Sequence, residues 1–426
     1  MNIKKLLKRL IPNSIWTWAK MERNKYRFNH HYGHIAKRIR HKKEPINVLF
    51  LATESAKWKY DGVFALMSSS HLFQPTILIC PIINKGREYM IASMAKCAAF
   101  FQEKGWPYIQ SYSLQNDAYL DPLSLKPDVV FFPEPYVGLM DSRYDMNVFN
   151  NSLTCYVNYG FINVNYSWAV GLPFHGKVWR YFVECESNYK FAKSLSPING
   201  INCKVVGYPS YDVLHIPATD YSEWKFGNSK RKRIIWSPHH SILETCKEIQ
   251  ISTFLLYYDI MLKLANKYKD KIEIAFKPHP LLKPALYSIS EWGKERTDAY
   301  YQLWAIGENT TLHENEYVNL FRSSDAIIND SASFTIEYLY TKNPALYLNN
   351  YDRTPICNEV GKAAFDVHYH ATTPDAIEEF ILKVVINGED TLKEQRECFY
   401  NTYLLPPNKS SVAENIVNEI IDACVK

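Results

Sequence analysis

Short, uninterrupted apolar runs alternate with helical patterns along most of the chain, and this order constrains the fold more than any other feature. The first series starts at Ile46 and predicts buried strands over 46–52, 76–80, 128–132, 154–157, 180–184 and 204–206. Helical patterns over 89–104 and 187–193 fit between these runs. Strands that are apolar on both sides are typical of a parallel sheet covered by helices on both faces.

A polar stretch over 220–232 separates this series from a second one. The second series predicts strands over 233–236, 272–276, 326–328 and 345–348, with helices over 249–267, 316–322, 334–340 and 373–385. A terminal helix is expected to open at Ser411. We therefore predict an α/β protein of two doubly wound, Rossmann-like domains facing a cleft, which is the glycosyltransferase-B architecture. The predicted segments are 1–44 (basic), 45–215 (N-terminal α/β domain), 216–395 (C-terminal α/β domain) and 396–426 (helical).

Composition excludes several classes of protein. The 426 residues are 47% hydrophobic and 22% charged, which is typical of globular domains. No apolar run approaches the roughly 20 residues of a membrane-spanning helix, and the start lacks the apolar core of a secretion signal. The nine cysteines form no C-x-x-C pair, which indicates a reducing cytosol and disfavours a zinc site.

Positive charge is concentrated at the start of the chain. Residues 1–43 contain 13 Lys and Arg against one acid, Glu22, whereas the rest carries 36 basic and 43 acidic residues. Apolar residues with a Trp pair lie between these charges, which predicts peripheral binding to the anionic inner face of the cell membrane. The alternative is a solvated tail or an arm packed on its own acidic body. No nucleic-acid recognition motif accompanies the charge, so nucleic acid is not an expected partner.

Two short segments at predicted strand ends carry imidazole and cationic groups. The first contains Ser237, His239 and His240 beside a proline, and can donate hydrogen bonds to phosphate or exchange a proton. The second, Lys277-Pro278-His279-Pro280, fixes a cation and an imidazole between two prolines. Exposed histidines and a proline-braced turn are the structural alternatives. Together the segments predict a phosphate-binding edge.

A third segment runs from a strand through Asp330, Ser331 and Ser333 into a helix that contains Glu337. Amides at the start of a helix bind anions, so this bend predicts a second part of the phosphate site. Glu337, one turn further on, is placed to accept hydrogen bonds from a ribose. A plain serine cap supported by Glu337 is the alternative.

In this order, the three segments resemble the donor half of the CDP-glycerol and CDP-ribitol polyol-phosphate transferases of teichoic acid and capsule synthesis. Lys277 to Pro280 is similar to the family's Arg/Lys-Pro-His-Pro segment. The stretch from Ser324 to Glu337 is similar to its Ser-Asp…Thr-Asp-Tyr-Ser-Ser…Asp signature, with Glu337 in place of Asp. The likeness covers about residues 150 to 350. The histidines at 239 and 240 stand where the family has an arginine-containing loop.

This resemblance implies a transferase that moves a polyol phosphate from a CDP-activated donor to a glycan or lipid-linked hydroxyl. Segment 45–215 would then be the acceptor-side domain and segment 216–395 the nucleotide-donor-binding domain. Donor-binding residues would be Ser237, Lys277, Asp330, Ser331, Ser333, Glu337 and Gly160, with no cofactor and no metal. The family's base is a histidine before glycine, and the matching pair here is Tyr159-Gly160. Candidate catalytic groups are His279, His239, His240, Glu134 and Tyr159.

A neutral tyrosine is a poor base, since its usual pKa is about 10. The base is therefore sought among acidic residues at predicted strand ends of the first half, with His175 nearby, or at His239 or His240. These acidic residues are Glu54, Asp61, Glu134 and Glu184, and Glu134 is slightly favoured.

Two alternatives remain open at this stage. The same fold and phosphate turn would hold a nucleotide sugar, which makes a glycosyltransferase of surface polysaccharide synthesis the second enzyme hypothesis. Because Tyr159 stands where the family has its catalytic histidine, a non-catalytic scaffold of the same fold is the third hypothesis. The donor that binds, and turnover, distinguish the three.

Overall fold

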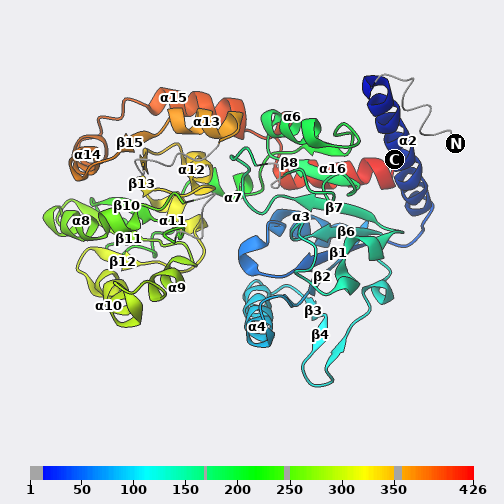
Figure 1. The fold of residues 1–426 in the computed structure, drawn as a ribbon, viewed down its shortest axis with the longest axis horizontal. Coiled ribbons are helices and arrows are strands. Elements are labelled where there is room, and N and C mark those ends of the chain that lie inside the picture. The colour runs from blue at the N-terminus through cyan, green and yellow to red at the C-terminus, as the bar shows by residue number, and fades with distance from the viewer. Residues whose placement is uncertain (1–12, 167–169, 244–249, 350–356) are drawn as a thin grey trace. The chain divides into compact units, whose positions relative to one another are not determined.

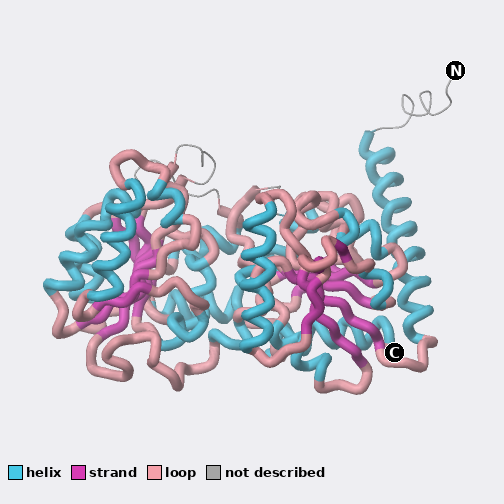
Figure 2. The backbone as a smooth tube through the Cα atoms, turned by 90° about the horizontal axis from the view of Figure 1, so that it is seen from below, coloured by secondary structure: helices cyan, strands magenta, loops and turns pink. Residues whose placement is uncertain are grey.

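The computed structural model describes residues 13–166, 170–243, 250–349 and 357–426. Packing divides the chain into two compact units. Unit 1 holds the described residues up to Gly160, Tyr166–Pro209 and Pro406–Lys426, and unit 2 holds Phe161–Asn165 and Ser210–Leu405. Each unit is one twisted parallel sheet with helices on both faces, as Figure 2 shows.

The sheet of unit 1 has seven parallel strands in the order β3-β2-β1-β6-β7-β8-β9 (Figure 1). They are β1 (Ile46–Ala52), β2 (Phe73–Ile79), β3 (Tyr108–Gln110), β6 (Val129–Phe132), β7 (Leu153–Val157), β8 (Arg180–Val183) and β9 (Cys203–Val205). A small antiparallel pair, β4 (Tyr112–Ser113) and β5 (Ala118–Tyr119), lies outside it. The helices are α2 (Asn13–Arg40), α3 (Asp61–Ser68), α4 (Arg87–Glu103), α6 (Glu186–Leu195) and α16 (Val412–Cys424).

Aromatic packing holds the centre of this sheet. Phe50 on β1 and Phe131 on β6 are register partners, and their rings stack with centroids 4.6 Å apart. Trp58, Tyr60 and Phe64 close around Phe50 from the segment that follows β1. Burial of such large side chains is the main favourable contribution to folding. The core therefore fixes the ends of β1 and β6, where polar side chains emerge.

Unit 2 contains six parallel strands in the order β12-β11-β10-β13-β14-β15. They are β10 (Lys232–Ser237), β11 (Ile272–Phe276), β12 (Thr310–Leu312), β13 (Ala326–Asn329), β14 (Ala345–Leu348) and β15 (Tyr369–Ala371). The helices are α7 (Tyr211–Leu214), α8 (Phe254–Lys267), α9 (Leu282–Tyr287), α10 (Gly293–Ile306), α11 (Val318–Ser323), α12 (Phe334–Glu337), α13 (Glu359–Asp366), α14 (Pro374–Glu379) and α15 (Lys393–Phe399). A π-helix, Phe380–Ile386, continues α14.

The core of unit 2 is also aromatic. Trp236, Phe254, Phe276 and Trp304 are fully buried, and Trp236 contacts each of the other three with ring centroids 4.9 to 5.8 Å apart. Trp236 and Phe276 are register partners at the carboxyl ends of β10 and β11. The loops that leave these two strands therefore start from a rigid base.

The last helix returns to unit 1. Ser411 caps α16 through a capping box with Glu414, and α16 packs on α2 and α3. The predicted segment 396–426 is thus divided, because residues up to Leu405 belong to unit 2 and those from Pro406 belong to unit 1. The passage between the units falls at Pro209 and Ser210, a few residues before the boundary at 215 that the sequence predicts.

Residues 13–40 form a single helix, α2, where the sequence predicts only a short amphipathic segment and a basic tail. Residues 1–12 of the predicted segment lie outside the described part of the chain. Tyr32, Ile35 and Ile39 are buried on one side of α2, because a spacing of three and four residues places them on one face. Among the described residues, no helix is long and apolar enough to cross a membrane.

Candidate functional site

Three segments that the sequence singles out lie side by side at the carboxyl edge of the unit 2 sheet. The loops of interest follow β10, β11 and β13, and β10 pairs with both of the other strands. Ser237 at the end of β10 is the register partner of Asn329 at the end of β13. Open parallel sheets bind their ligands at this edge. The fold therefore brings the predicted phosphate-binding residues of unit 2 together.

Three histidines form a compact cluster at this edge. The rings of His239 and His240 have centroids 4.3 Å apart, and those of His240 and His279 are 4.2 Å apart. One nitrogen from each of the three lies within 4.8 Å of the others. His239 is buried, whereas His240 and His279 are half-buried.

Hydrogen bonds decide where the imidazole protons lie. Nδ1 of His279 accepts the amide of Leu281 at 3.1 Å, and Nδ1 of His239 accepts the amide of Ser241 at 3.3 Å. A neutral imidazole carries one proton, so in His279 that proton is on Nε2. Nδ1 of His239 also lies 2.8 Å from the Ser241 hydroxyl, which can accept or donate, so either nitrogen of this ring can carry the proton. The Nε2–H group of His279 is a donor, which suits an anion, whereas a metal ion would require an unprotonated nitrogen at that position.

The histidines are neutral at physiological pH. Burial, together with the neighbouring His240 and His279 rings, lowers the pKa of His239 to about 2. Burial, His240 and Lys277 lower the pKa of His279 to about 3. Burial also lowers the pKa of His240. A bound anion would offset these effects, since it favours the charged form of each ring.

Asp330 holds the histidine loop in place. Its buried carboxylate accepts hydrogen bonds from the backbone amides of His239 and Thr253 and from the Thr253 hydroxyl. Burial raises the pKa of Asp330 to about 6, although these donated hydrogen bonds oppose the rise. The sequence predicts Asp330 as a donor-binding residue. In the structure its oxygens meet protein groups, so it positions the loop.

Two other predicted donor-binding residues are also engaged with the protein. The Ser237 hydroxyl donates to the carbonyl of Lys277 at 2.9 Å and links β10 to β11. The Lys277 ammonium is buried and donates to the carbonyl of Asn315. Lys277 thus contributes positive charge from behind the histidine cluster.

The bend after β13 differs in detail from the prediction. The helix that follows it, α12, has four residues before the chain tightens into a 3₁₀ turn over Tyr338–Thr341. Ser331 and Ser333 are half-buried, and the Ser331 hydroxyl accepts the amide of Phe334 at 3.4 Å. The buried carboxylate of Glu337 accepts hydrogen bonds from the hydroxyls of Tyr317 and Ser210. Contact between Glu337 and a ribose stays a prediction.

Sequence reasoning missed Ser252 and Thr253, which complete the loop together with Ser241 of the first segment. The Ser252 hydroxyl donates to the carbonyl of His239 at 2.7 Å, and the Ser241 hydroxyl accepts the amide of Ile251 at 3.0 Å. A Ser-Thr pair directly before an apolar helix is a helix-start signal, and it identifies the true beginning of α8. The predicted start of this helix, at 249, lies outside the described residues.

Unit 1 carries its own polar cluster, at the carboxyl ends of the neighbouring strands β1, β6 and β7. Glu134 follows β6, and its carboxylate receives hydrogen bonds from Lys57 at 2.6 Å and Thr53 at 3.0 Å. Tyr159 follows β7, and its hydroxyl lies 3.1 Å from that of Tyr136. Gly160 beside it is half-buried.

These contacts change the roles open to Glu134 and Tyr159. Burial raises the pKa of Glu134, and the Lys57 ammonium opposes that rise. Burial and the Tyr136 hydroxyl raise the pKa of Tyr159 far above its usual value, so its phenol stays protonated. Tyr159 is therefore suited to donating a hydrogen bond. Lys57, which the sequence analysis does not identify, lies at the centre of the cluster with its Nζ 5.8 Å from the centroid of the Tyr159 ring.

The two Rossmann-like sheets define the fold as glycosyltransferase-B-like. The structure of the wall teichoic acid polymerase TagF is similar, with a TM-score of 0.55 and 12% identity over 95% of this chain and 98% of that one. A UDP-GlcNAc 2-epimerase from Neisseria meningitidis, determined with UDP-GlcNAc bound, has a TM-score of 0.56 and 13% identity over 88% and 100% of the two chains. A putative UDP-N-acetylglucosamine 2-epimerase from Listeria monocytogenes has a TM-score of 0.53 and 13% identity over 89% and 96%.

No protein-family model matches the sequence, and no curated protein does. At these identities, the likeness to solved structures establishes the fold alone.

Proposed function

We propose that this chain is a transferase that moves a polyol phosphate from a CDP-activated donor to a glycan or lipid-linked hydroxyl in cell-envelope polymer synthesis. The observation that carries the proposal is the histidine cluster at the carboxyl edge of unit 2. It combines imidazole donors with the hydroxyl-rich bend after β13. Similar folds in TagF and in epimerases that bind nucleotide sugars are consistent with a nucleotide-linked donor.

The donor diphosphate would lie along His240 and His279, which are half-buried, with Ser331 and Ser333 on the neighbouring loop. His239 is buried beneath them and would contribute an Nε2–H from that side when its proton is on that nitrogen. Negative charge develops on the leaving phosphate as its bond to the transferred group breaks. Fixed donors and the buried Lys277 ammonium would stabilise that charge without reorganising.

Donor identity tests the proposal directly. Purified protein is heated alone and with CDP-glycerol, CDP-ribitol and a panel of nucleotide sugars, because a ligand that binds the folded state raises Tm. We expect CDP-polyols to raise Tm and the His279→Asn variant to lose that rise. In this variant the asparagine Oδ1 can still accept the Leu281 amide, but the donor at the Nε2 position is gone.

A nucleotide-sugar-dependent glycosyltransferase is the second candidate. The observation that favours it is the UDP-GlcNAc-bound epimerase structure, whose TM-score equals that of TagF within 0.01. If only sugar nucleotides raise Tm, the CDP-polyol proposal is wrong and this candidate replaces it. Binding without turnover on any acceptor would instead favour the scaffold alternative.

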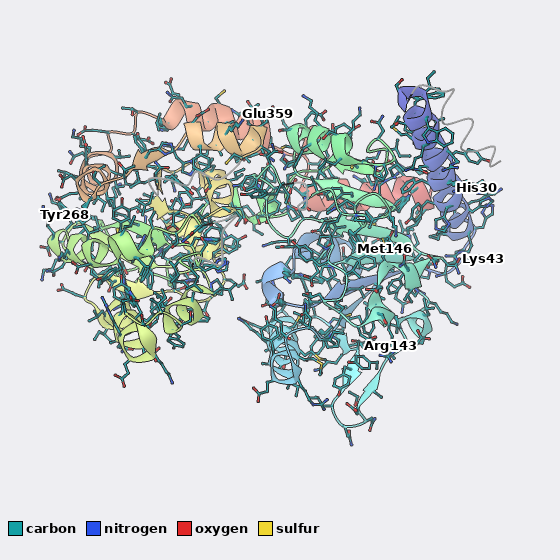
Figure 3. All side chains as sticks on the ribbon, viewed as in Figure 1. His30, Lys43, Arg143, Met146, Tyr268 and Glu359 are labelled. Atoms are coloured by element: carbon teal, nitrogen blue, oxygen red, sulfur yellow. The ribbon has the colours of Figure 1, made fainter. Side chains whose placement is uncertain are left out.

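The basic helix α2 is proposed to hold the protein on an anionic membrane surface. Its second half is fixed to the rest of unit 1, where Tyr32 donates to the carbonyl of Lys177, and Lys42, just after the end of α2, pairs with Asp128 at 2.5 Å. Ile15, Trp18 and Tyr26 are 53%, 60% and 69% exposed, and His30 on the same helix projects into solvent (Figure 3). Exposed aromatic groups among Lys and Arg suit a lipid headgroup layer.

Vesicle sedimentation tests this arm. The double variant Ile15→Ser, Trp18→Ser should bind phosphatidylglycerol vesicles more weakly than the wild-type chain, with its donor-induced rise in Tm unchanged. The matched control is Leu303→Ser, Ile306→Ser on α10 of unit 2, which removes apolar side chains that are 50% and 66% exposed. Equal loss in both variants, or none in the first, would contradict the proposal.

A further inference from the structure

The polar cluster of unit 1 is centred on one ammonium group. Lys57 Nζ lies 2.6 Å from a carboxylate oxygen of Glu134 and 2.8 Å from one of Glu54. The two glutamates come from different strand ends, after β6 and β1 respectively. Lys57 itself is on a 3₁₀ turn, η1 (Ser55–Lys57), directly after β1. Two carboxylates and one ammonium make this strand edge a net acceptor of hydrogen bonds.

Exposure separates the roles of the two glutamates. The side chain of Glu134 is 0% exposed, whereas that of Glu54 is 22% exposed and that of Lys57 is 18% exposed. A ligand at this edge can reach Glu54 but cannot reach the carboxylate of Glu134 unless the cluster opens. Of the candidate bases at strand ends that the sequence offers, Glu54 is therefore better placed than Glu134, which the sequence analysis favours slightly.

The surroundings of Glu54 fix its orientation. One of its oxygens accepts the Tyr89 hydroxyl at 2.5 Å and the other accepts the Lys57 ammonium. A carboxylate has about four acceptor positions, so two remain after these bonds. Burial opposes ionisation of Glu54, but the hydrogen bonds from Lys57 and Tyr89 outweigh it and lower its pKa. Glu54 is thus an ionised acceptor held in one direction.

We infer that Glu54 is the group that meets the acceptor hydroxyl, and that Lys57 and Glu134 are the residues that position it. This inference rests on the proposed transferase function. The acceptor oxygen forms a bond to the β-phosphorus of the CDP-polyol, and the bond from that phosphorus to the bridging oxygen breaks. CMP leaves with the electron pair, and the hydroxyl proton passes to Glu54 and then to solvent.

The same charges define the class of acceptor. Lys57 lies between two carboxylates, and the Lys85 ammonium donates at 3.1 Å to the Tyr89 hydroxyl that Glu54 accepts, so the charges balance when these groups are ionised. A phosphate beside the attacking hydroxyl would therefore gain no net attraction and would meet the Glu54 carboxylate at close range, whereas a neutral polyol or sugar would donate its hydroxyls to Glu54. The aromatic rings of Tyr136 and Tyr159, whose hydroxyls are in contact, provide a surface for a sugar ring. The geometry points to a neutral, hydroxyl-rich acceptor end.

Surrogate acceptors test the inference with the full-length protein. Consumption of CDP-glycerol is measured with glycerol and with glycerol 3-phosphate as the added hydroxyl. We expect glycerol to accelerate consumption more than glycerol 3-phosphate does. We expect Glu54→Gln to reduce the glycerol-dependent rate about a hundredfold, in the range of a general base, while the donor-induced rise in Tm is unchanged.

The glycerol-dependent rates of two Lys57 variants test whether Lys57 positions Glu54. Lys57→Met should lower the glycerol-dependent rate, and Lys57→Arg should restore most of it, because arginine keeps the charge between the two carboxylates. Glu419→Gln is the matched control, since it breaks ion pairs with Arg180 and Lys204 on the same unit without touching the cluster. It should transfer at the wild-type rate.

These measurements distinguish failure of the proposed transferase function from failure of the inference about Glu54. Absence of any rise in Tm with CDP-polyols would overturn the proposed function. A normal rise in Tm with undiminished transfer by Glu54→Gln, or a preference for glycerol 3-phosphate, would overturn this inference while leaving the proposed function standing.

Discussion

The backbone amide of His239 donates a hydrogen bond to the buried carboxylate of Asp330, which ties the loop after β10 to the end of β13. Thr253, at the start of α8, binds the other oxygen of the same carboxylate through its amide and its hydroxyl. One side chain thus joins three parts of the unit 2 sheet edge. The histidine cluster depends on it, because His239 cannot shift without leaving one oxygen of the buried Asp330 carboxylate without this hydrogen bond.

Replacement of Asp330 by alanine should therefore affect stability and binding together. The change leaves two buried amides and a hydroxyl without an acceptor, and each unsatisfied buried group costs about 1 to 3 kcal/mol. We expect the free energy of unfolding, measured by urea denaturation, to fall by roughly 3 kcal/mol or more. Asp325→Ala, which removes a half-buried partner of Arg233, is the control and should lower it less. Equal losses would contradict the role of Asp330.

Glycine at 207 is required by both backbone and packing. Its φ is +96°, and a Cβ placed there would lie 2.7 Å from Cγ2 of Val412 and 2.9 Å from Cβ of Pro406. Gly207→Ala should therefore lower the free energy of unfolding by about 2 to 4 kcal/mol, because a strained φ and overpacking add. Gly227→Ala has a φ of +53° but no atom within 4 Å of the new Cβ, so it reports the backbone contribution alone.

The difference between these two variants, measured by thermal or urea denaturation, isolates the contact of Gly207 with Pro406 and with Val412 at the start of α16. If both variants lose the same stability, that contact contributes nothing measurable.

The accuracy with which the sequence predicts each strand and helix depends on how completely that element is buried. β11 and β14 coincide with the predicted ranges, because every residue in both is buried and the apolar run has no gaps. β12 and β15 were missed because each has three residues and only one of them is buried. The long helix α2 was missed because its sequence is polar overall, and its stability comes from packing on unit 1.

The residues of the candidate site also fall into two groups: those that local sequence predicts and those whose role only tertiary contacts reveal. Local sequence predicted the segments of His240, His279 and Ser331, because each follows directly on an apolar run and carries imidazole, ammonium or hydroxyl groups. It could not assign Asp330 and Glu337, since only tertiary contacts show whether a carboxylate faces a ligand or a buried amide. Lys57 gave no local signal, because it acts through Glu134, which is 77 residues away in sequence.

Acid should destabilise the protein through its buried histidines. His175 has a pKa lowered to about 4 by burial, and burial lowers that of His368 to about 3, as it does for His279. In the unfolded chain each titrates near 6.5. Their contribution to stability is therefore present above pH 6.5 and is lost as pH falls, by up to about 1.4 kcal/mol per pH unit for each ring.

Asp330 changes the free energy of unfolding with pH in the direction opposite to the buried histidines. Its raised pKa favours the folded state below the unfolded value and loses that effect as pH rises through about 6. The histidines outnumber it, so we expect the free energy of unfolding to fall between pH 6.5 and 4.5. His175→Gln should make the fall shallower in urea denaturation across this range, whereas the exposed His41→Gln should not. A stability that rises on acidification would contradict this balance.

Donor binding should take up protons. In the free protein His239 and His279 are neutral, and a diphosphate close to their rings favours their charged form and raises their pKa values toward neutrality. Binding then draws protons from the buffer, and more of them as pH falls from 8 to 6. Calorimetric titration of CDP-glycerol in buffers with different ionisation enthalpies measures the number of protons taken up on binding.

Two histidine variants test whether the imidazoles of the cluster take up these protons. His279→Asn, studied at a donor concentration high enough to saturate it, should take up fewer protons, whereas His41→Gln should match the wild-type chain. Binding with no proton uptake across this range would mean that the diphosphate does not approach the imidazoles, and would place the donor elsewhere on the protein.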